Sequence, residues 1–409
     1  MKKRFFGFIL GASVVLSSFN TAYAKPEVQV SRIFGSSRYQ TAVNVSKTYY
    51  DKSDTVLVAS GEGFADALVG GTLASQVDAP LLLTNSNDLS KEVSNEIKRL
   101  EAKKIYLLGG KGTVTKKVED ELNSLAPVTR LFGKNRFETA KAIGNERITL
   151  AKAEEHHIAA VNGFEYPDAL ASAPFIGQFG NEKTEITLLL PYEKEMKTNY
   201  IIGGEGSVDY KGEVIKRFKG DDRVKTSLEI ANSYEEYLEV KPNALIVVNG
   251  DDYPDALSAV SASKALKAPI ILNRGKHVSE DLSKYLDENE IEKIIVIGGE
   301  GSVPDSVFRE LLDGKPYTPP TIIPTEEPTK PTDGHKPTET GVPMDLDKLW
   351  VDKNGNGLIK GNISSKGEKI YHVPGQAAYD RTRINPRKGE RWFKTERQAQ
   401  KAGWRRSEK

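Results

Sequence analysis

The segment Arg32-Ile-Phe-Gly-Ser-Ser-Arg38-Tyr-Gln-Thr41 decides the fold, because the chain repeats it. The repetition reads Arg130-Leu-Phe-Gly-Lys-Asn-Arg136-Phe-Glu-Thr139 and, more loosely, Arg217-Phe-Lys-Gly-Asp-Asp-Arg223-Val-Lys-Thr226. Self-similarity of this kind marks repeat architectures, in which each copy is one structural unit. We call this segment block one.

Two further blocks follow each copy of block one in the same order. Block two reads Gly61-Glu-Gly-Phe-Ala-Asp66, Gly163-Phe-Glu-Tyr-Pro-Asp168 and Gly250-Asp-Asp-Tyr-Pro-Asp255. Block three reads Gly109-Gly-Lys-Gly-Thr113, Gly203-Gly-Glu-Gly-Ser207 and Gly298-Gly-Glu-Gly-Ser302. These blocks predict three tandem repeats, over residues 30–127, 128–214 and 215–313.

Between the blocks, short apolar runs alternate with amphipathic stretches. The runs 55–59, 80–83 and 105–108 are apolar at nearly every position, as in parallel strands covered by helices on both faces. Residues 90–100 show the spacing of an amphipathic helix. Each repeat is therefore predicted to be a small, doubly wound α/β domain. The stretch 168–203 is about two helical turns shorter than its counterparts 66–109 and 255–298, so the second repeat is expected to have a reduced middle.

The remaining segments divide the chain further. Residues 1–24 have the basic start, short apolar run and small residues of a cleaved export signal, and no later stretch is long and apolar enough to span a membrane. Residues 317–343 are rich in Pro and Thr, which predicts an extended linker. Residues 345–409 hold 16 basic and 8 acidic residues, in contrast to the acidic repeats. They are expected to form a small basic α+β module.

The order of the blocks and their triplication resemble the type 2 cell-wall-binding repeats of clostridia and related Gram-positive bacteria. The resemblance covers about residues 30–313. It implies three Rossmann-like domains around a pseudo-threefold axis, a monomer with an intramolecular trimer of repeats. It also implies a secreted protein at the cell surface, held on the cell wall by an anionic secondary polymer.

The repeated charged residues are the candidate binding residues. Arg38, Arg136 and Arg223 enter a predicted helix, and a guanidinium group binds phosphate or carboxylate with two parallel hydrogen bonds. The alternative is that each Arg pairs with an acidic residue, within its domain or at the contact between repeats. Asp66, Asp168 and Asp255 precede Ala-Leu helix starts, so we expect them to cap these helices or to pair with the repeated Arg residues.

Catalytic and cofactor signals are weak in this sequence. Cys is absent, which excludes thiol nucleophiles and Cys-based zinc sites. The five His residues do not recur between repeats, and no metalloprotease or serine hydrolase motif is present, so we expect no catalytic residues and no metal. Block three lacks the P-loop Lys and the full dinucleotide-binding spacing, so a tight turn is favoured over a cofactor site.

The C-terminal segment has its own resemblance, carried by Gly357-Leu-Ile-Lys-Gly-Asn-Ile, Gly367-Glu-Lys-Ile-Tyr-His372-Val-Pro-Gly and Gly389-Glu-Arg-Trp-Phe-Lys394-Thr-Glu. It is similar to a short module appended to secreted bacterial proteins, including some thermonuclease-like nucleases. Lys394 stands where those relatives often have Cys. Basic residues among aromatic ones suit nucleic acid or an anionic glycan.

Two hypotheses of different classes follow. The first is a protein anchored non-covalently to the Gram-positive cell wall through an anionic secondary polymer, displaying the basic C-terminal module. The alternative is a wall-targeted secreted hydrolase acting on peptidoglycan or nucleic acid, for which no catalytic residues can be named.

Overall fold

The computed structural model describes residues 28–179, 185–314, 350, 358–364, 367–374, 376, 379, 381–384 and 390–407. The predicted signal peptide and linker lie outside these residues. The chain forms two compact units, one before and one after about residue 321, and each is described by itself. Within the described ranges, no helix has the length and apolar character needed to cross a bilayer.

The first unit contains three parallel sheets of four strands with one shared topology. Sheet 1 consists of β2 (Thr55–Ser60), β3 (Leu81–Thr84), β4 (Lys104–Leu108) and β5 (Val128–Leu131), in the order β3-β2-β4-β5. Sheet 2 consists of β6 (Glu155–Val161), β7 (Glu185–Pro191), β8 (Tyr200–Ile202) and β9 (Lys216–Phe218), in the order β7-β6-β8-β9. Sheet 3 consists of β1 (Gln29–Ile33), β10 (Ala244–Asn249), β11 (Ile270–Asn273) and β12 (Lys293–Ile297), in the order β11-β10-β12-β1. The α/β class with repeated doubly wound sheets is confirmed.

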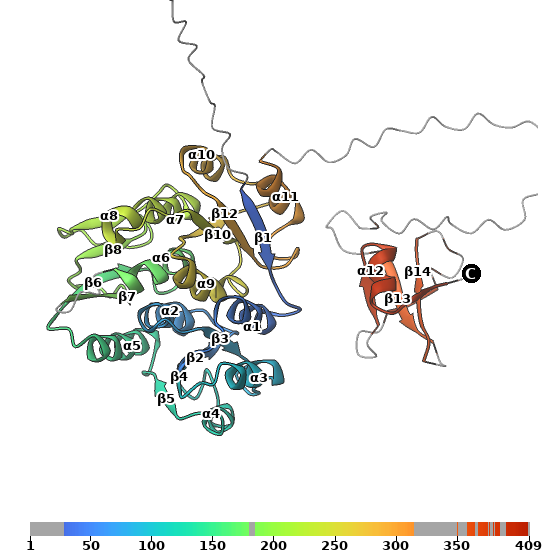
Figure 1. Cartoon of the computed structure of the whole chain (residues 1–409), viewed down its shortest axis with the longest axis horizontal. Helices are drawn as coiled ribbons and strands as arrows, with labels where there is room; N and C mark the ends of the chain where they lie inside the picture. The colour runs from blue at the N-terminus through green and yellow to red at the C-terminus, as the bar shows by residue number, and fades with distance from the viewer. Residues whose placement is uncertain are drawn as a thin grey trace, which may run out of the picture. The chain divides into compact units, whose positions relative to one another are not determined.

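Each sheet is completed by the first strand of the next repeat. β5 begins repeat 2 but pairs with β4 of repeat 1, and β9 begins repeat 3 but pairs with β8 of repeat 2. β1 closes the circle, since it begins repeat 1 and pairs with β12 of repeat 3, with Arg32 opposite Val296. Figure 1 shows β1 beside β12 and β10, far from the sheet formed by β2 to β5. The three repeats therefore form a closed ring rather than three separate domains.

Block one forms the turn that carries each exchanged strand into a helix. The helices α1 (Arg38–Tyr49), α5 (Arg136–Ala151) and α7 (Arg223–Asn232) begin directly after N-caps at Ser37, Asn135 and Asp222. The side chain of each N-cap residue accepts a hydrogen bond from a backbone N–H of the first turn. A side-chain hydroxyl in each helix, on Thr41, Thr139 and Thr226, accepts a hydrogen bond from the N–H of the block-one Gly. These local bonds fix the angle between strand and helix.

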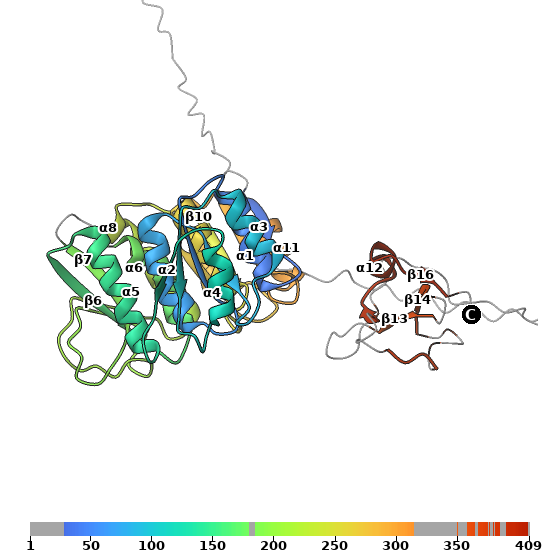
Figure 2. The same cartoon turned by 90° about the horizontal axis from the view of Figure 1, so that it is seen from below.

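The helices after block two form the centre of the ring. These are α2 (Ala65–Val77), α6 (Pro167–Gln178) and the pair η1 (Ala256–Ser258) and α9 (Ala259–Leu266). Figures 1 and 2 show α2 beside α6, and one continuous core of buried side chains runs through all three repeats. A Cβ atom added at Gly71 would lie 3.0 Å from Val260 and 3.3 Å from Ala173, so the three helices meet there without room for a larger residue.

Repeat 2 lacks two helices that the other repeats possess. α3 (Lys91–Arg99) and α4 (Lys116–Asn123) in repeat 1 correspond to α10 (Glu280–Glu288) and α11 (Asp305–Asp313) in repeat 3. They cover the outer faces of sheets 1 and 3 and form a second hydrophobic cluster in each. Residues 192–199 and 203–214 of repeat 2 contain no helix, which confirms its reduced middle. The remaining helix, α8 (Tyr234–Leu238), follows α7 in repeat 3.

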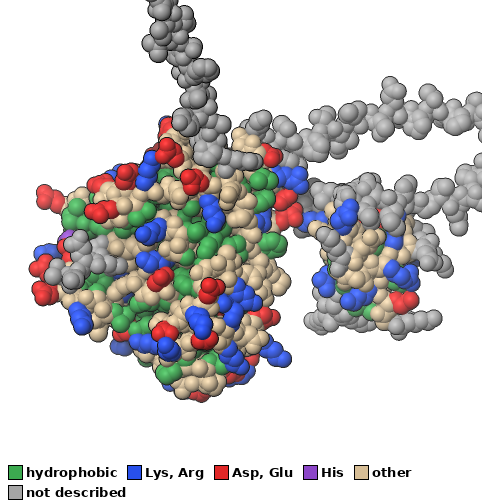
Figure 3. All heavy atoms as spheres, viewed as in Figure 1, with side chains coloured by type: hydrophobic (Ala, Val, Ile, Leu, Met, Phe, Trp, Pro, Cys, Tyr) green, Lys and Arg blue, Asp and Glu red, His purple; other side chains and the backbone are tan. Residues whose placement is uncertain are grey.

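The described residues of the second unit form a small mixed sheet and one helix. The strands β13 (Ile359–Ile363), β14 (Lys369–His372), β15 (Arg391–Phe393) and β16 (Arg405–Arg406) are arranged in the order β15-β13-β14-β16. The helix α12 (Glu396–Lys401) packs on a core that includes Tyr371, Phe393 and Trp404. On the face shown in Figure 3, Lys and Arg side chains predominate over Asp and Glu in this unit.

Candidate functional site

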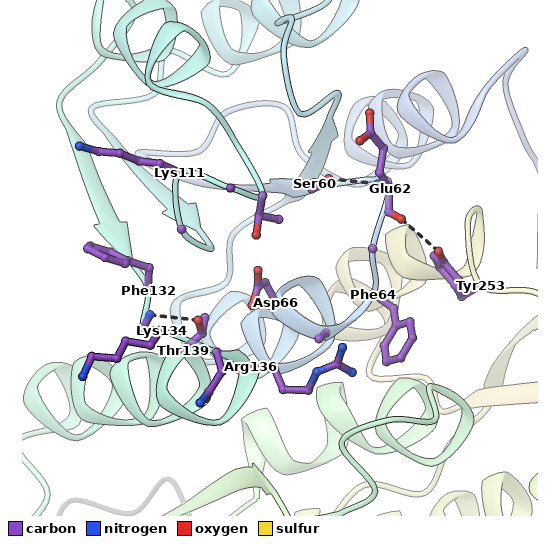
Figure 4. A pocket seen from close by; sticks show the side chains of 17 residues that line it. Ser60, Glu62, Phe64, Asp66, Lys111, Phe132, Lys134, Arg136, Thr139 and Tyr253 are labelled. Carbon is purple, nitrogen blue, oxygen red and sulfur yellow. Dashed lines mark hydrogen bonds between the residues drawn. The ribbon is translucent and has the colours of Figure 1, made fainter.

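The three blocks, distant in sequence, meet at the carboxyl ends of the strands, where one repeat adjoins the next. At junction 1, blocks two and three of repeat 1 and block one of repeat 2 enclose a cleft of about 660 Å³ (Figure 4). At junction 2, the same blocks of repeats 2 and 3 enclose a cleft of about 470 Å³. At junction 3, block one of repeat 1 meets block three of repeat 3, where Arg32 donates to the carbonyl oxygen of Gly298 over 3.2 Å. Ligands of open parallel sheets commonly bind at this edge.

Arg136 and Arg223 line the clefts at junctions 1 and 2, but among the described residues no candidate arginine forms the ion pair considered above. Nη1 of Arg136 donates to the carbonyl oxygen of Gly163 over 2.6 Å, Nη1 of Arg223 donates to that of Gly250, and Arg38 donates to that of Gly61. The guanidinium group of Arg136 also lies 5.0 Å from the ring centre of Phe164 and 5.6 Å from that of Phe64. Each Arg thus ties block two to block one of its own repeat, and Arg136 also contacts the preceding repeat.

The candidate aspartates lie beside block three, and none of them caps a helix with its side chain. Asp66 and Asp168 are in the first turns of α2 and α6, and neither helix has a side-chain capping bond, so the predicted capping is wrong there. Oδ2 of Asp168 accepts a hydrogen bond from Ser207 over 3.0 Å. Asp255 is the N-cap of η1, also without a side-chain capping bond. We expected these carboxylates to bond to backbone N–H groups in the first turn of their helices, but they face the block-three loop instead.

The first glycine of block three allows the close approach of this carboxylate. Gly109 and Gly203 have φ of 95° and 105°, and an added Cβ would lie 2.4 Å from Oδ2 of Asp66 and 2.3 Å from Oδ2 of Asp168. Both a left-handed backbone and a collision disfavour any other residue there. The loop is a tight turn, closed by a bond from the N–H of Thr113 to the carbonyl oxygen of Gly110 over 2.9 Å.

A glycine substitution in this loop tests the packing. Gly109→Ala is expected to lower the free energy of unfolding by about 1–3 kcal/mol, because it adds backbone strain and displaces Asp66. Gly112→Ala is the matched control, since an added Cβ at Gly112 meets nothing within 4 Å. Urea unfolding of both variants measures the difference. Equal stability of the two would contradict this account of the loop.

Burial raises the pKa of Asp168 above its ordinary value, and the hydrogen bond from Ser207 and the charge of Arg223 offset part of this effect. A carboxyl group with a raised pKa in the folded state disfavours folding once it is ionised, so this cost is present at neutral pH and vanishes below the ordinary pKa. Asp168→Asn, which still accepts from Ser207, is expected to raise the melting temperature at pH 7, with a gap that closes towards pH 3.

The control for this pH dependence is Asp221→Asn. The hydrogen bond and charge of Lys225 lower the pKa of Asp221, so its carboxylate favours folding at neutral pH and loses that contribution as the pH falls through the lowered pKa. Thermal unfolding at both pH values should therefore show effects of opposite sign for the two variants. The same sign in both would refute the assignment.

Three aromatic side chains of block two meet around the centre of the ring, and sequence reasoning missed them. The ring centres of Phe64, Tyr166 and Tyr253 are 5.4–6.0 Å apart in all three pairs. Oη of Tyr166 donates to the carbonyl oxygen of Gly250 over 2.9 Å, and Oη of Tyr253 donates to that of Glu62. The aromatic residue two positions before each block-two Asp was the available signal. Contact between the repeats explains this recurrence.

The first arginine of block one was also missed, although it recurs without exception. Arg130 donates to the carbonyl oxygens of Gly109 and Val114 over 2.8 and 3.0 Å. Arg32 and Arg217 make the equivalent bonds to block three of the preceding repeat in the ring. These side chains hold each exchanged strand against the neighbouring loop, so they are structural.

Three of the histidines that the structure describes make separate local contacts. His157 lies on β6 beside Glu185, His277 contacts Glu310, and Nε2 of His372 lies 3.0 Å from Oδ1 of Asn362 in the second unit. Over the described residues, no group of three His, Asp or Glu side chains is placed to hold a metal ion. The junctions, with their clefts, are therefore the candidate binding region.

Comparison with known proteins shows the family to which the repeats belong. The family model for cell wall binding domain 2 matches residues 32–119, 130–213 and 217–308, which together exceed half of the chain. The first match begins within β1, at Arg32, and the last match ends before the predicted linker. The three matches correspond to the three copies of the blocks.

The relatives have wall-related names. N-acetylmuramoyl-L-alanine amidase LytC of Bacillus subtilis (strain 168) is 29% identical over 293 residues, and the amidase enhancer of the same strain is 28% identical over 287 residues. Each alignment covers 69% of this chain, but only 58% and 40% of the relatives' own lengths.

Two solved structures share the fold. Cwp6 from Clostridium difficile has a TM-score of 0.61 and 26% identity, over 75% of this chain and 51% of that one. Cwp8 from the same organism has a TM-score of 0.58 and 26% identity, over 70% and 52% of the two chains. The chain therefore belongs to the cell wall binding domain 2 family, with three copies of the domain, and is a surface protein of the Gram-positive cell wall.

Proposed function

We propose that the ring of repeats anchors this chain non-covalently to the cell wall by binding an anionic wall polymer, and that it displays the basic C-terminal module. The observation that supports this most strongly is the cleft at junction 1. Its lining carries three basic side chains, Lys111, Lys134 and Arg136, against the acidic Glu62 and Asp66. An excess of cationic groups in a cleft of about 660 Å³ suits a chain of anionic sugar units.

Sedimentation with purified walls tests the proposal. The full chain should sediment with walls that carry their anionic polymers, and walls stripped with cold hydrofluoric acid should retain much less of it. Retention on intact walls should also fall as sodium chloride is raised, because salt screens charge attraction. Equal retention on intact and stripped walls would overturn the anionic part of the proposal.

The proposal gives the chain a binding role rather than a catalytic one. The family model describes a binding domain, and the alignments with the amidase LytC and the amidase enhancer cover only 58% and 40% of those proteins. Zymography on peptidoglycan and on DNA should therefore show no clearing. A cleared zone that His372→Ala abolishes would favour the hydrolase instead.

The C-terminal module contributes a second cationic surface to the proposal. Trp392 is 46% exposed and follows the exposed Arg391 on β15, and Lys and Arg side chains predominate over Asp and Glu on the face of this unit seen in Figure 3. Cationic and aromatic groups together suit an anionic glycan or single-stranded nucleic acid. A gel-shift assay with single-stranded DNA and a wall-derived glycan separates these ligands, and a Trp392→Ala variant should weaken whichever binds.

A further inference from the structure

The three junctions share their architecture but differ in charge at equivalent positions. The middle residue of block three is Lys111 at junction 1, Glu205 at junction 2 and Glu300 at junction 3. The residue after the block-one Gly is Lys134, Asp221 and Ser36 in the same order. The recurring Arg and Asp are present in all three repeats, so they do not account for this difference in charge. Junction 1 has two additional cations there, and the other junctions have none.

The two lysines of junction 1 are available to a ligand. Both are exposed, and neither ammonium group forms an ion pair with a described residue. Only the backbone N–H of Lys134 is engaged, with Oε2 of Glu138 over 2.9 Å. Figure 4 shows Lys111 and Lys134 on the same side of the cleft, with Phe132 between them. Unpaired ammonium groups at a cleft are well suited to bind oxyanions.

The ring of Phe132 adds an apolar surface between the lysines. Its side chain belongs to a residue that is 54% exposed, and the ring lines the cleft. Exposed aromatic rings flanked by cations suit a sugar ring that carries a charged group. The acidic Glu62 is directed elsewhere, since Oε2 accepts a hydrogen bond from Ser86 over 2.6 Å and its carboxylate points out of the cleft in Figure 4.

Junction 2 has the opposite character. Lys219 replaces the exposed Phe, and its Nζ pairs with Glu205 over 2.9 Å. Asp221 pairs with Lys225 over 2.9 Å, and Asp222 caps α7. The cleft lining holds four acidic residues and one basic residue, so an anion would be repelled. Junction 3 retains the exposed ring of Phe34 but carries Glu300 and Ser36 in place of the two lysines.

We propose that the chain binds its wall polymer at junction 1 alone, where Lys111 and Lys134 bind oxyanions of an anionic glycan and Phe132 contacts a sugar ring between them. This inference rests on the proposed function and makes it more specific. Junctions 2 and 3 then serve to close the ring. Each chain therefore has one binding site for the polymer, and the strength of anchoring depends on one pair of lysines rather than on three equivalent sites.

The test is sedimentation of the full chain with purified intact walls. Lys111→Glu/Lys134→Glu gives junction 1 the charge of junction 2 and should weaken retention by about tenfold or more, because two charged contacts become repulsive. Lys91→Glu/Lys211→Glu is the matched control, with the same change in net charge at exposed positions outside the lining of both clefts. This control should bind as the wild type does.

Two further variants distinguish one site from three. Ser36→Glu places a carboxylate at junction 3 and should leave retention unchanged. Glu205→Lys/Asp221→Lys gives junction 2 the lysines of junction 1 and should raise the amount of polymer bound per chain. Lys111→Gln/Lys134→Gln removes both positive charges without adding negative ones. It should also weaken retention, though less than the Glu variant does. Agreement between the two variants would show that the loss does not come from misfolding of the Glu variant.

The outcomes separate this inference from the proposed function. If stripping the walls releases the wild type but the Lys111/Lys134 variants stay bound, the polymer binds elsewhere and the inference fails alone. A partial loss of similar size from the Ser36 variant and the Lys111/Lys134 variants would also overturn it. If stripping does not release the wild type, the anionic proposal itself fails.

Discussion

Deletion of residues 28–34 is expected to unfold sheet 3 first, although these residues begin repeat 1. β1 is the edge strand beside β12, and the backbone N–H of Gln29 donates to the carbonyl oxygen of Glu292 over 2.8 Å. Arg32 binds the carbonyl oxygen of Val303 over 2.7 Å and lies 4.7 Å from the ring centre of Phe308. Repeat 3 loses all these contacts in the deletion.

The expected loss is large because several kinds of contact disappear together. The ladder to β12, the Arg32 bonds and the packing of the partly buried Ile33 add up to at least about 3 kcal/mol of unfolding free energy. Hydrogen exchange measured by mass spectrometry should show faster exchange in β10 and β12 than in β2, which serves as the internal reference. Arg32→Ala should give an intermediate effect. Unchanged exchange in β12 would contradict the closed ring.

Arg147→Ala is expected to be the most destabilising single substitution in repeat 2. The Arg147 side chain is fully buried, and burial lowers its pKa to about 9. Nε donates to Oε1 of Gln76 and Nη1 donates to the carbonyl oxygen of Thr187, each over 2.7 Å. The guanidinium group therefore joins α2 of repeat 1 to the edge of sheet 2.

The Ala variant leaves both a cavity and buried acceptors without a donor. We expect it to lower the free energy of unfolding by about 3–5 kcal/mol. Arg147→Met fills most of the volume and removes the buried charge, so its cost should be smaller. Thermal unfolding of the two variants and the wild type measures this order. If the Ala variant has the same melting temperature as the wild type, the buried Arg does not link the repeats.

Much of this fold can be predicted from the recurring blocks. Apolar runs such as 105–108 predict buried parallel strands, and the shortened stretch 168–203 predicts the missing helix between β7 and β8. The sequence does not predict that the first strand of each repeat joins the sheet of the preceding repeat. β5 has the pattern of a buried strand whichever sheet it joins, and it is its backbone pairing with β4, together with the bond from Arg130 to the carbonyl oxygen of Gly109, that places it with repeat 1.

The candidate site was predictable in part. The recurrence of Arg136 and Asp66 places them at a junction, but both are occupied by structural contacts, Arg136 with Gly163 and Asp66 beneath Gly109. Lys111 and Lys134 differ between repeats, so a search for recurring residues passes over them. The two lysines share a cleft only because consecutive repeats are in contact, which brings block three of one repeat beside block one of the next.

Because the repeats form a closed ring, deleting a whole repeat cannot test whether binding is multivalent. Three weak sites would predict that losing one repeat releases the protein, but removing any repeat also takes away a strand from the sheet before it. Release would then follow from unfolding, whether or not binding is multivalent. Point substitutions in the junctions avoid this ambiguity.

Hydrogen exchange of the full chain, with and without purified intact walls, tests the central claim most directly. Walls should slow exchange in segments 62–66, 110–113 and 132–136, which line junction 1, and stripped walls should not. Segments 204–207 and 220–223 of junction 2 should exchange at the same rate in both samples. Protection confined to residues 358–407, or equal protection of junctions 1 and 2, would contradict anchoring through the first junction.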